Sequence, residues 1–149
     1  MPILLRRAAI VVSVSVLSLV YGCDAGRGFV KDDFVWIAGS RDLSRLIVPG
    51  AAVFFRPVVS LTFWVDHALF GLDPLGYGLT NLALLLACVG MLFLLLKALG
   101  LRAGVAAAGA LVWALNFQAV NMAVLWISGR TALVLVFWTA AAACGCGRR

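Results

Sequence analysis

The sequence predicts an all-α integral membrane protein with about four transmembrane helices. Of its 149 residues, 64% are hydrophobic and only 12% are charged, whereas about 25% of a soluble domain is charged. Uncharged stretches recur at lengths close to the roughly 20 residues that cross a bilayer. Basic residues flank these stretches, as the positive-inside rule requires: Arg6, Arg7, Lys97, Arg102, Arg148 and Arg149. A soluble core of this size would leave large apolar patches exposed.

The composition argues against several classes of function. The net charge is +6, but the twelve basic residues are scattered, so nucleic acid is not a predicted partner. The four cysteines form no CxxC pair and His67 is the only histidine, so we expect no metal site, and no ligand set supports a divalent cation. The sequence contains no P-loop, nucleotide fingerprint or nucleophile elbow.

The first predicted span covers residues of about 6–22. Its uncharged part follows Arg6 and Arg7, which is typical of a first span or of a signal peptide. The residues before Cys23 loosely resemble a lipoprotein cleavage box, so a lipid anchor on Cys23 is an alternative. Tyr21 is bulky for such a box, and the apolar residues 3–5 lengthen the stretch. A retained span with a cytoplasmic amino terminus is therefore the favoured interpretation.

Residues 23–73 form the predicted outer loop. All six acidic residues of the chain are aspartates within it, and glycines and prolines divide its first half into short runs. Within it, Arg56-Pro57 and Asp66-His67 bound an apolar segment, and charges at these places make a crossing helix costly. We therefore expect an amphipathic interfacial helix at about 52–70, with aromatic residues at the membrane surface.

Three further spans are predicted, at about 75–96, 103–120 and 127–147. Lys97 and Arg102 flank a tight connection between the first two, and an outer turn falls near residues 116–121. Only Arg130 interrupts the uncharged sequence after that connection. We expect one membrane domain over 1–149, with its amino terminus and its last span ending on the cytoplasmic side.

Asp32 and Asp33 are the predicted catalytic residues. The pair lies between the apolar runs that end at Val30 and begin at Phe34, close to the membrane face. Adjacent carboxylates beside a low-dielectric surface repel each other, which favours general acid/base or cation-binding work. The alternative is a solvated turn with a helix N-cap.

Four further residues are candidates for binding substrate. Arg130 and Arg56 could hold a lipid-linked phosphate through bidentate hydrogen bonds, or could extend to the interface as structural cations. His67, next to Asp66, could form a proton relay, although a surface histidine is more often structural. Asn81 lies in a predicted span, where bonding between helices would explain its amide as well.

Three segments together carry a resemblance to a known family. They are Asp32-Asp33-Phe34, the run FRPVVSLTFWVDHALFGLDPLGYGLTN from Phe55 to Asn81, and AVLWISGRTALV from Ala123 to Val134. In this order they resemble the amino-terminal part of GT-C class membrane glycosyltransferases. The nearest likeness is to the transmembrane and tetratricopeptide-repeat O-mannosyltransferases and their bacterial relatives, over residues of about 5–140.

The resemblance implies a partial GT-C fold and a specific chemistry. An aspartate in the first outer loop, here Asp32 or Asp33, would act as base, and the donor would be a sugar on a polyprenyl phosphate. Arg130 would contact the phosphate, with Arg56 as a second cation. The implied partners are membrane lipid, the lipid-linked sugar and a protein or glycan acceptor. The implied location is the extracytoplasmic side of a bacterial inner (plasma) membrane.

The sequence also departs from the family pattern. Gly78 and Leu85 stand where relatives usually have histidines, and Phe117, Gln118 and Met122 replace a histidine-proline and glutamate. Such enzymes have more spans, so we expect an amino-terminal fragment that is inactive alone. The alternative function is a small non-catalytic membrane scaffold or assembly subunit that binds a partner through its outer loop.

Overall fold

The computed structural model describes residues 3–30, 32–39, 41, 56–116, 124 and 126–146. Regular structure in these ranges is helical throughout. The helices are α1 (Ile3–Gly22), α2 (Asp33–Gly39), α3 (Pro57–Phe70), α4 (Pro74–Ala98), α5 (Ala103–Ala114) and α7 (Arg130–Cys146), and a 3₁₀ turn, η3 (Ile127–Gly129), precedes α7. The all-helical class predicted from the sequence is therefore confirmed for these residues.

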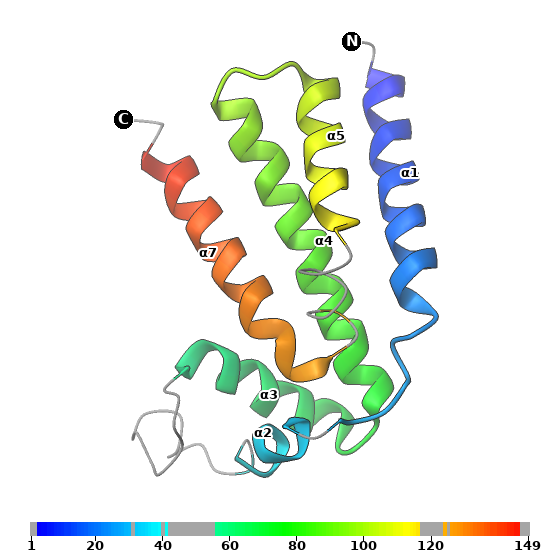
Figure 1. The fold of residues 1–149 in the computed structure, drawn as a ribbon, viewed down its shortest axis with the longest axis vertical. Helices are drawn as coiled ribbons and strands as arrows, with labels where there is room; N and C mark the ends of the chain where they lie inside the picture. The colour runs from blue at the N-terminus through cyan, green and yellow to red at the C-terminus, as the bar shows by residue number, and fades with distance from the viewer. Residues whose placement is uncertain are drawn as a thin grey trace.

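Long helices run side by side, and the short ones gather at one end of them (Figure 1). Helix α4 is central, because it packs against α1, α3, α5 and α7. The start of α1, the end of α7 and the α4–α5 connection lie at one end of the bundle, while α2 and α3 lie at the other (Figure 1). The predicted outer loop and the predicted cytoplasmic connection are thus at opposite ends of the molecule.

Among the described residues, two helical stretches are long and apolar enough to cross a membrane: Pro74–Ala98 and Ile127–Gly145. They correspond to the predicted spans at 75–96 and 127–147 and indicate association with a membrane. The first predicted span coincides with α1, which begins at Ile3. The third begins with α5, a shorter apolar helix of 12 residues, and residues 117–120 of that span lie outside the described residues.

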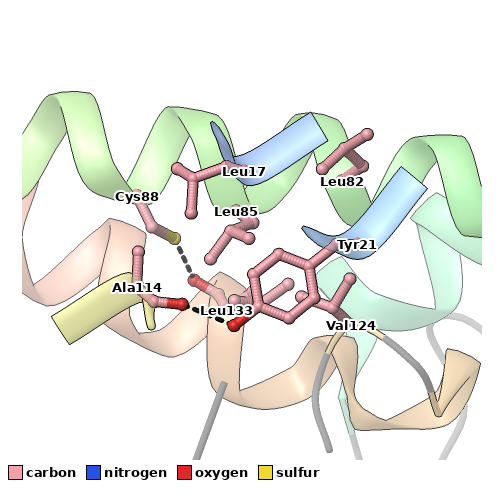
Figure 2. Packing of buried hydrophobic residues seen from close by; sticks show 8 residues of the cluster. All are labelled: Leu17, Tyr21, Leu82, Leu85, Cys88, Ala114, Val124 and Leu133. Atoms are coloured by element: carbon pink, nitrogen blue, oxygen red, sulfur yellow. Dashed lines mark hydrogen bonds between the residues drawn. The ribbon is translucent and has the colours of Figure 1, made fainter. Parts of the chain in front are cut away.

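The bundle core is formed by side chains from four helices and from Val124 (Figure 2). Two bonds to main-chain carbonyls cross it. The hydroxyl of Tyr21 donates to the carbonyl of Ala114 at 2.7 Å, and the thiol of Cys88 donates to the carbonyl of Leu133 at 3.1 Å. They connect α1 with α5 and α4 with α7. Ala114 is the last residue of α5, where main-chain carbonyls have no partner within their own helix.

Helices α3 and α4 are joined by a tight turn that explains their ends. Helix α3 begins at Pro57, which is suited to a first turn because its missing N–H needs no partner there. Gly71 ends the helix with φ of 61°, a conformation that favours glycine. Asp73 then caps α4, since its carboxylate accepts from the N–H of Leu75 at 3.0 Å.

Two features of the end that carries α2 and α3 add to the prediction. Residues 33–39 form a short helix, α2, within the predicted loop, and it begins at the aspartate pair for which a helix N-cap was the alternative explanation. Gly78 allows α4 to approach the end of α1, because a Cβ at this position would collide with the carbonyl of Ala25. The interfacial helix predicted at about 52–70 is α3, and residues 52–55 lie outside the described residues.

Candidate functional site

The two adjacent aspartates have different surroundings. Asp33 is completely buried, and each of its carboxylate oxygens accepts a main-chain hydrogen bond. One comes from the N–H of Val30 at 2.8 Å and the other from the N–H of Ser128 at 2.7 Å. The N–H of Asp33 in turn donates to the carbonyl of Val30, so α2 begins with a reciprocal pair of bonds. Asp33 therefore connects the start of α2 to η3, 95 residues later.

Asp32 is exposed. Its main-chain carbonyl accepts from the N–H groups of Val35 and Trp36, which places it at the entrance of α2. The two hydrogen bonds of the Asp33 carboxylate hold the start of α2 in place, and the main chain of Asp32 with it. Of the predicted catalytic pair, Asp32 is the one whose carboxylate can meet a ligand in this conformation.

Arg130 is completely buried and forms an ion pair with Asp66, which is only 2% exposed. One guanidinium nitrogen lies 2.6 Å from the Asp66 carboxylate and 3.2 Å from the Thr62 hydroxyl. The other terminal nitrogen donates to the carbonyl of Tyr77 at 3.3 Å. The second oxygen of Asp66 accepts from Thr80 at 2.7 Å. Arg130, a candidate phosphate contact from the sequence, thus has its anionic partner within the protein, and that partner is Asp66.

Two arginines enclose a pair of stacked aromatic rings. The guanidinium of Arg130 lies 4.2 Å from the Phe63 ring centre, and Phe63 stacks on Trp36 at 5.8 Å. The guanidinium of Arg56 lies 5.8 Å from the centre of the other ring, that of Trp36. It also donates a hydrogen bond to the Thr131 hydroxyl at 3.0 Å. Cations are attracted to aromatic faces. Arg56 is half-buried, so it is the more accessible of the two arginines.

His67 belongs to the turn after α3. Its Nδ1 lies 3.1 Å from the carbonyl of Gly71 and 3.5 Å from the hydroxyl of Tyr77, which also donates to Gly71 at 2.8 Å. Asp66, the predicted relay partner of His67, is bonded instead to Thr80 and Arg130. The contacts of His67 therefore stabilise the α3–α4 turn.

Asn81 connects α4 to the segment before α7. Its amide nitrogen lies 3.5 Å from the carbonyl of Val124 and 3.4 Å from that of Ile127, and its side chain is fully buried. These bonds agree with the structural explanation offered for it, namely bonding between helices.

Within the described ranges, no group of three or more histidine, cysteine or acidic side chains could hold a metal ion. In the Asp32-Asp33 pair, Asp33 already has both oxygens bonded to N–H groups. The exposed carboxylate of Asp32 is therefore the member of that pair that is available to a ligand.

No protein-family model, curated protein or solved structure matches this chain. The positions that depart from the GT-C pattern have clear local roles where they are described. Gly78 lies against the backbone of Ala25, and Leu85 is buried in the bundle core. Phe117, Gln118 and Met122 lie outside the described residues.

Sequence reasoning did not select Asp66, Thr62 and Thr80, although they surround Arg130. A signal was present in the spacing. Thr62 and Asp66 are four residues apart, so they lie on the same side of a helix, and the other side of that segment is apolar. Arg130 is a single cation in an apolar stretch, where a carboxylate is needed to balance its charge. Asp66 is the aspartate in the most apolar segment of the loop.

Proposed function

We propose that this chain is the amino-terminal part of a membrane glycosyltransferase that moves a sugar from a polyprenyl-phosphate donor to a hydroxyl acceptor. One observation carries the proposal. The three segments that resemble GT-C enzymes meet at one end of the bundle, through the contacts Asp33–Ser128, Asp66–Arg130 and Arg56–Thr131. These segments, residues 32–34, 55–81 and 123–134, are far apart in sequence. A shared site requires that they come together in the fold.

In this proposal Asp32 is the catalytic base. Its exposed carboxylate takes the proton of the acceptor hydroxyl as the hydroxyl oxygen attacks the anomeric carbon of the sugar. The bond from that carbon to the lipid phosphate breaks, and the phosphate leaves with the electron pair. Asp33 does not touch the substrate. It positions Asp32 through its bonds to Val30 and Ser128.

Arg56 is the proposed phosphate contact. A guanidinium near the leaving phosphate stabilises the negative charge that develops on it. Arg130 is fully buried and paired with Asp66, so its role is to support Arg56 through the Phe63–Trp36 ring pair. The aromatic rings also shield this charge from water, which strengthens its interaction with an anion.

The proposal places four spans in the membrane, formed by α1, α4, α5 with the residues after it, and α7. The end that carries α2 and α3 then faces the extracytoplasmic side of a bacterial inner membrane, where a polyprenyl-linked sugar is presented. The positions of Lys97 and Arg102 at the opposite end support this orientation.

Sugar transfer by membranes that contain a full-length enzyme with this chain as its amino-terminal part tests the proposal. Radiolabelled polyprenyl-phosphate hexose is supplied with hydroxyl-bearing peptides, and label in the peptide is counted. We expect Asp32→Asn to remove transfer and Arg56→Gln to lower it by about 10- to 1000-fold, since lost charge stabilisation has this size. Asp24→Asn, which removes a different outer carboxylate, should transfer like the wild type. Unchanged transfer in Asp32→Asn would contradict the assignment.

A donor-binding experiment distinguishes an inactive fragment of a glycosyltransferase, which still binds the donor, from a protein of another class, which does not. A photoreactive polyprenyl phosphate should label the wild-type chain, and Arg56→Gln should label less. Labelling that is equal in both variants, and is not displaced by unlabelled donor, would count against the proposed phosphate contact.

A second candidate is the non-catalytic scaffold, and one observation favours it. Asp33 and Arg130 are fully buried with bonds to other parts of the chain, as expected of structural residues. Phe34 and Val35 are exposed on α2 beside them and could contact a partner protein. A photoreactive amino acid at Val35 should then crosslink to one defined protein in the native membrane, and crosslinking only to lipid would argue against the scaffold.

A further inference from the structure

We infer that α3 lies within the hydrocarbon layer, with acyl chains covering the side that faces away from the protein. Every exposed residue of this helix is apolar: Pro57, Val58, Leu61, Trp64, Val65, Ala68, Leu69 and Phe70. A continuous apolar helix face is not stable against water. The inference is independent of sugar transfer.

The polar residues of α3 face the other way. Asp66 is buried, and Ser60, Thr62 and His67 are half-buried. Two of them, Asp66 and Thr62, contact Arg130. An ordinary interfacial helix turns its polar side to water and its apolar side to lipid. In α3 the polar side is occupied by the protein, so the helix has no side suited to water.

The surroundings of this face indicate lipid rather than a second protein. Helix α3 packs against α4 and α7, the two helices that are long and apolar enough to cross a membrane. Those helices also expose large apolar side chains, such as Leu79 on α4 and Leu135 on α7. The exposed face of α3 carries no charge, whereas protein interfaces have a polar rim. Exposed apolar side chains are thus found on the two spans as well as on α3, which packs against them.

The ion pair explains how an aspartate is tolerated in such a helix. A carboxylate in hydrocarbon is costly on its own. The opposite charges of Arg130 and Asp66 lie 2.6 Å apart and compensate each other. Thr62 and Thr80 donate or accept further hydrogen bonds to the pair. Arg130 therefore permits α3 to remain in the lipid.

Nitroxide labels test the position of α3. Single cysteines replace Leu61, Val65 or Leu69 in a chain whose four native cysteines are replaced, reconstituted in vesicles of phosphatidylethanolamine and phosphatidylglycerol. Collisions are measured with oxygen, which enters lipid, and with a water-soluble nickel complex. Three further label positions serve as controls: exposed Arg41 for water, Leu135 for lipid and buried Val59 for protein.

We expect the three labels to match Leu135, with high oxygen collision and roughly tenfold less nickel collision than at Arg41, as the cost of placing polar solutes in hydrocarbon predicts. Nickel collision equal to that at Arg41 would overturn the inference, because α3 would then face water. Low collision with both reagents, as at Val59, would also overturn it, because a second copy or another protein would then cover the face.

A second pair of variants tests the part played by the ion pair. Arg130→Gln leaves the charge of Asp66 without its partner, so nickel collision at labels replacing Leu61 and Leu69 should rise toward that at Arg41. The double variant Asp66→Asn/Arg130→Gln removes both charges and should restore the lipid-facing pattern. Labels that do not respond to Arg130→Gln would show that the pair does not hold α3 in the lipid.

Discussion

At the scale of single residues, burial gives neighbouring side chains different roles. Asp32 and Asp33 are adjacent and chemically identical, but Asp32 is exposed while Asp33 is bonded to two main-chain N–H groups. Arg56 and Arg130 differ in the same way, because Arg56 is half-buried and Arg130 is paired inside the protein. In each pair, the more exposed member is the better candidate for contact with a substrate.

Loss of one member of the buried ion pair should strongly destabilise the protein. We expect Arg130→Gln to lower the free energy of unfolding by about 3–5 kcal/mol, because Asp66 is left as an uncompensated buried charge. Thermal unfolding in detergent measures the change. Arg27→Gln breaks the more exposed pair with Asp24 and should cost about 1 kcal/mol or less. Similar losses in the two variants would contradict the buried arrangement.

The two aspartates should differ in their contribution to stability. Asp33→Ala leaves the buried N–H groups of Val30 and Ser128 without their acceptor, at a cost of about 1–3 kcal/mol for each N–H. Asp32→Asn changes an exposed side chain and should stay within about 0.5 kcal/mol of the wild type. Unfolding by denaturant in detergent compares them, and the reverse order would refute the assignment of roles.

At the scale of helices, close approach depends on a few small residues and caps. Helix α4 meets the end of α1 at Gly78, where even one added carbon would collide with the Ala25 carbonyl. The Tyr21 hydroxyl and the Cys88 thiol add bonds between helices (Figure 2). These contacts connect α1 with α5, α4 with α7, and α4 with the segment that follows α1.

Two glycines of α4 should respond oppositely to alanine. Gly78→Ala should destabilise the chain by about 1–3 kcal/mol, because the backbone of Ala25 must move. At Gly90 an added Cβ meets no atom within 4 Å among those described, so Gly90→Ala should stabilise the helix by up to about 1 kcal/mol. Thermal unfolding of both variants in detergent checks this, and a stabilising effect at Gly78 would contradict the packing.

At the scale of the whole molecule, the fold separates two ends with different chemistry. The aspartate pair, the ion pair and both site arginines lie on or next to α2, α3 and the start of α7. The end of α4, which carries Lys97, and the start of α5, which follows Arg102, lie at the opposite end (Figure 1). Lys97 and Arg102 flank the short α4–α5 connection, and the positive-inside rule favours an orientation that places such a connection in the cytoplasm.

Reporter fusions should reveal this orientation. Alkaline phosphatase, which is active only outside the cytoplasm, should be active when inserted at Arg41 and inactive when inserted at Gly100. A fluorescent protein that folds only in the cytoplasm should give the opposite result. Activity of both reporters at the same position would contradict a single orientation.

The sequence by itself determined the helical class and the two stretches, Pro74–Ala98 and Ile127–Gly145, that are long and apolar enough to cross a membrane. Apolar runs, caps and flanking charges are local features, so the chain records them directly. The tertiary structure alone decided that Asp33 binds Ser128 and that Arg130 binds Asp66, across 95 and 64 residues. It also decided that α3 turns its polar side inward. Such pairings depend on how helices pack, and no local pattern specifies which of six aspartates an arginine will meet.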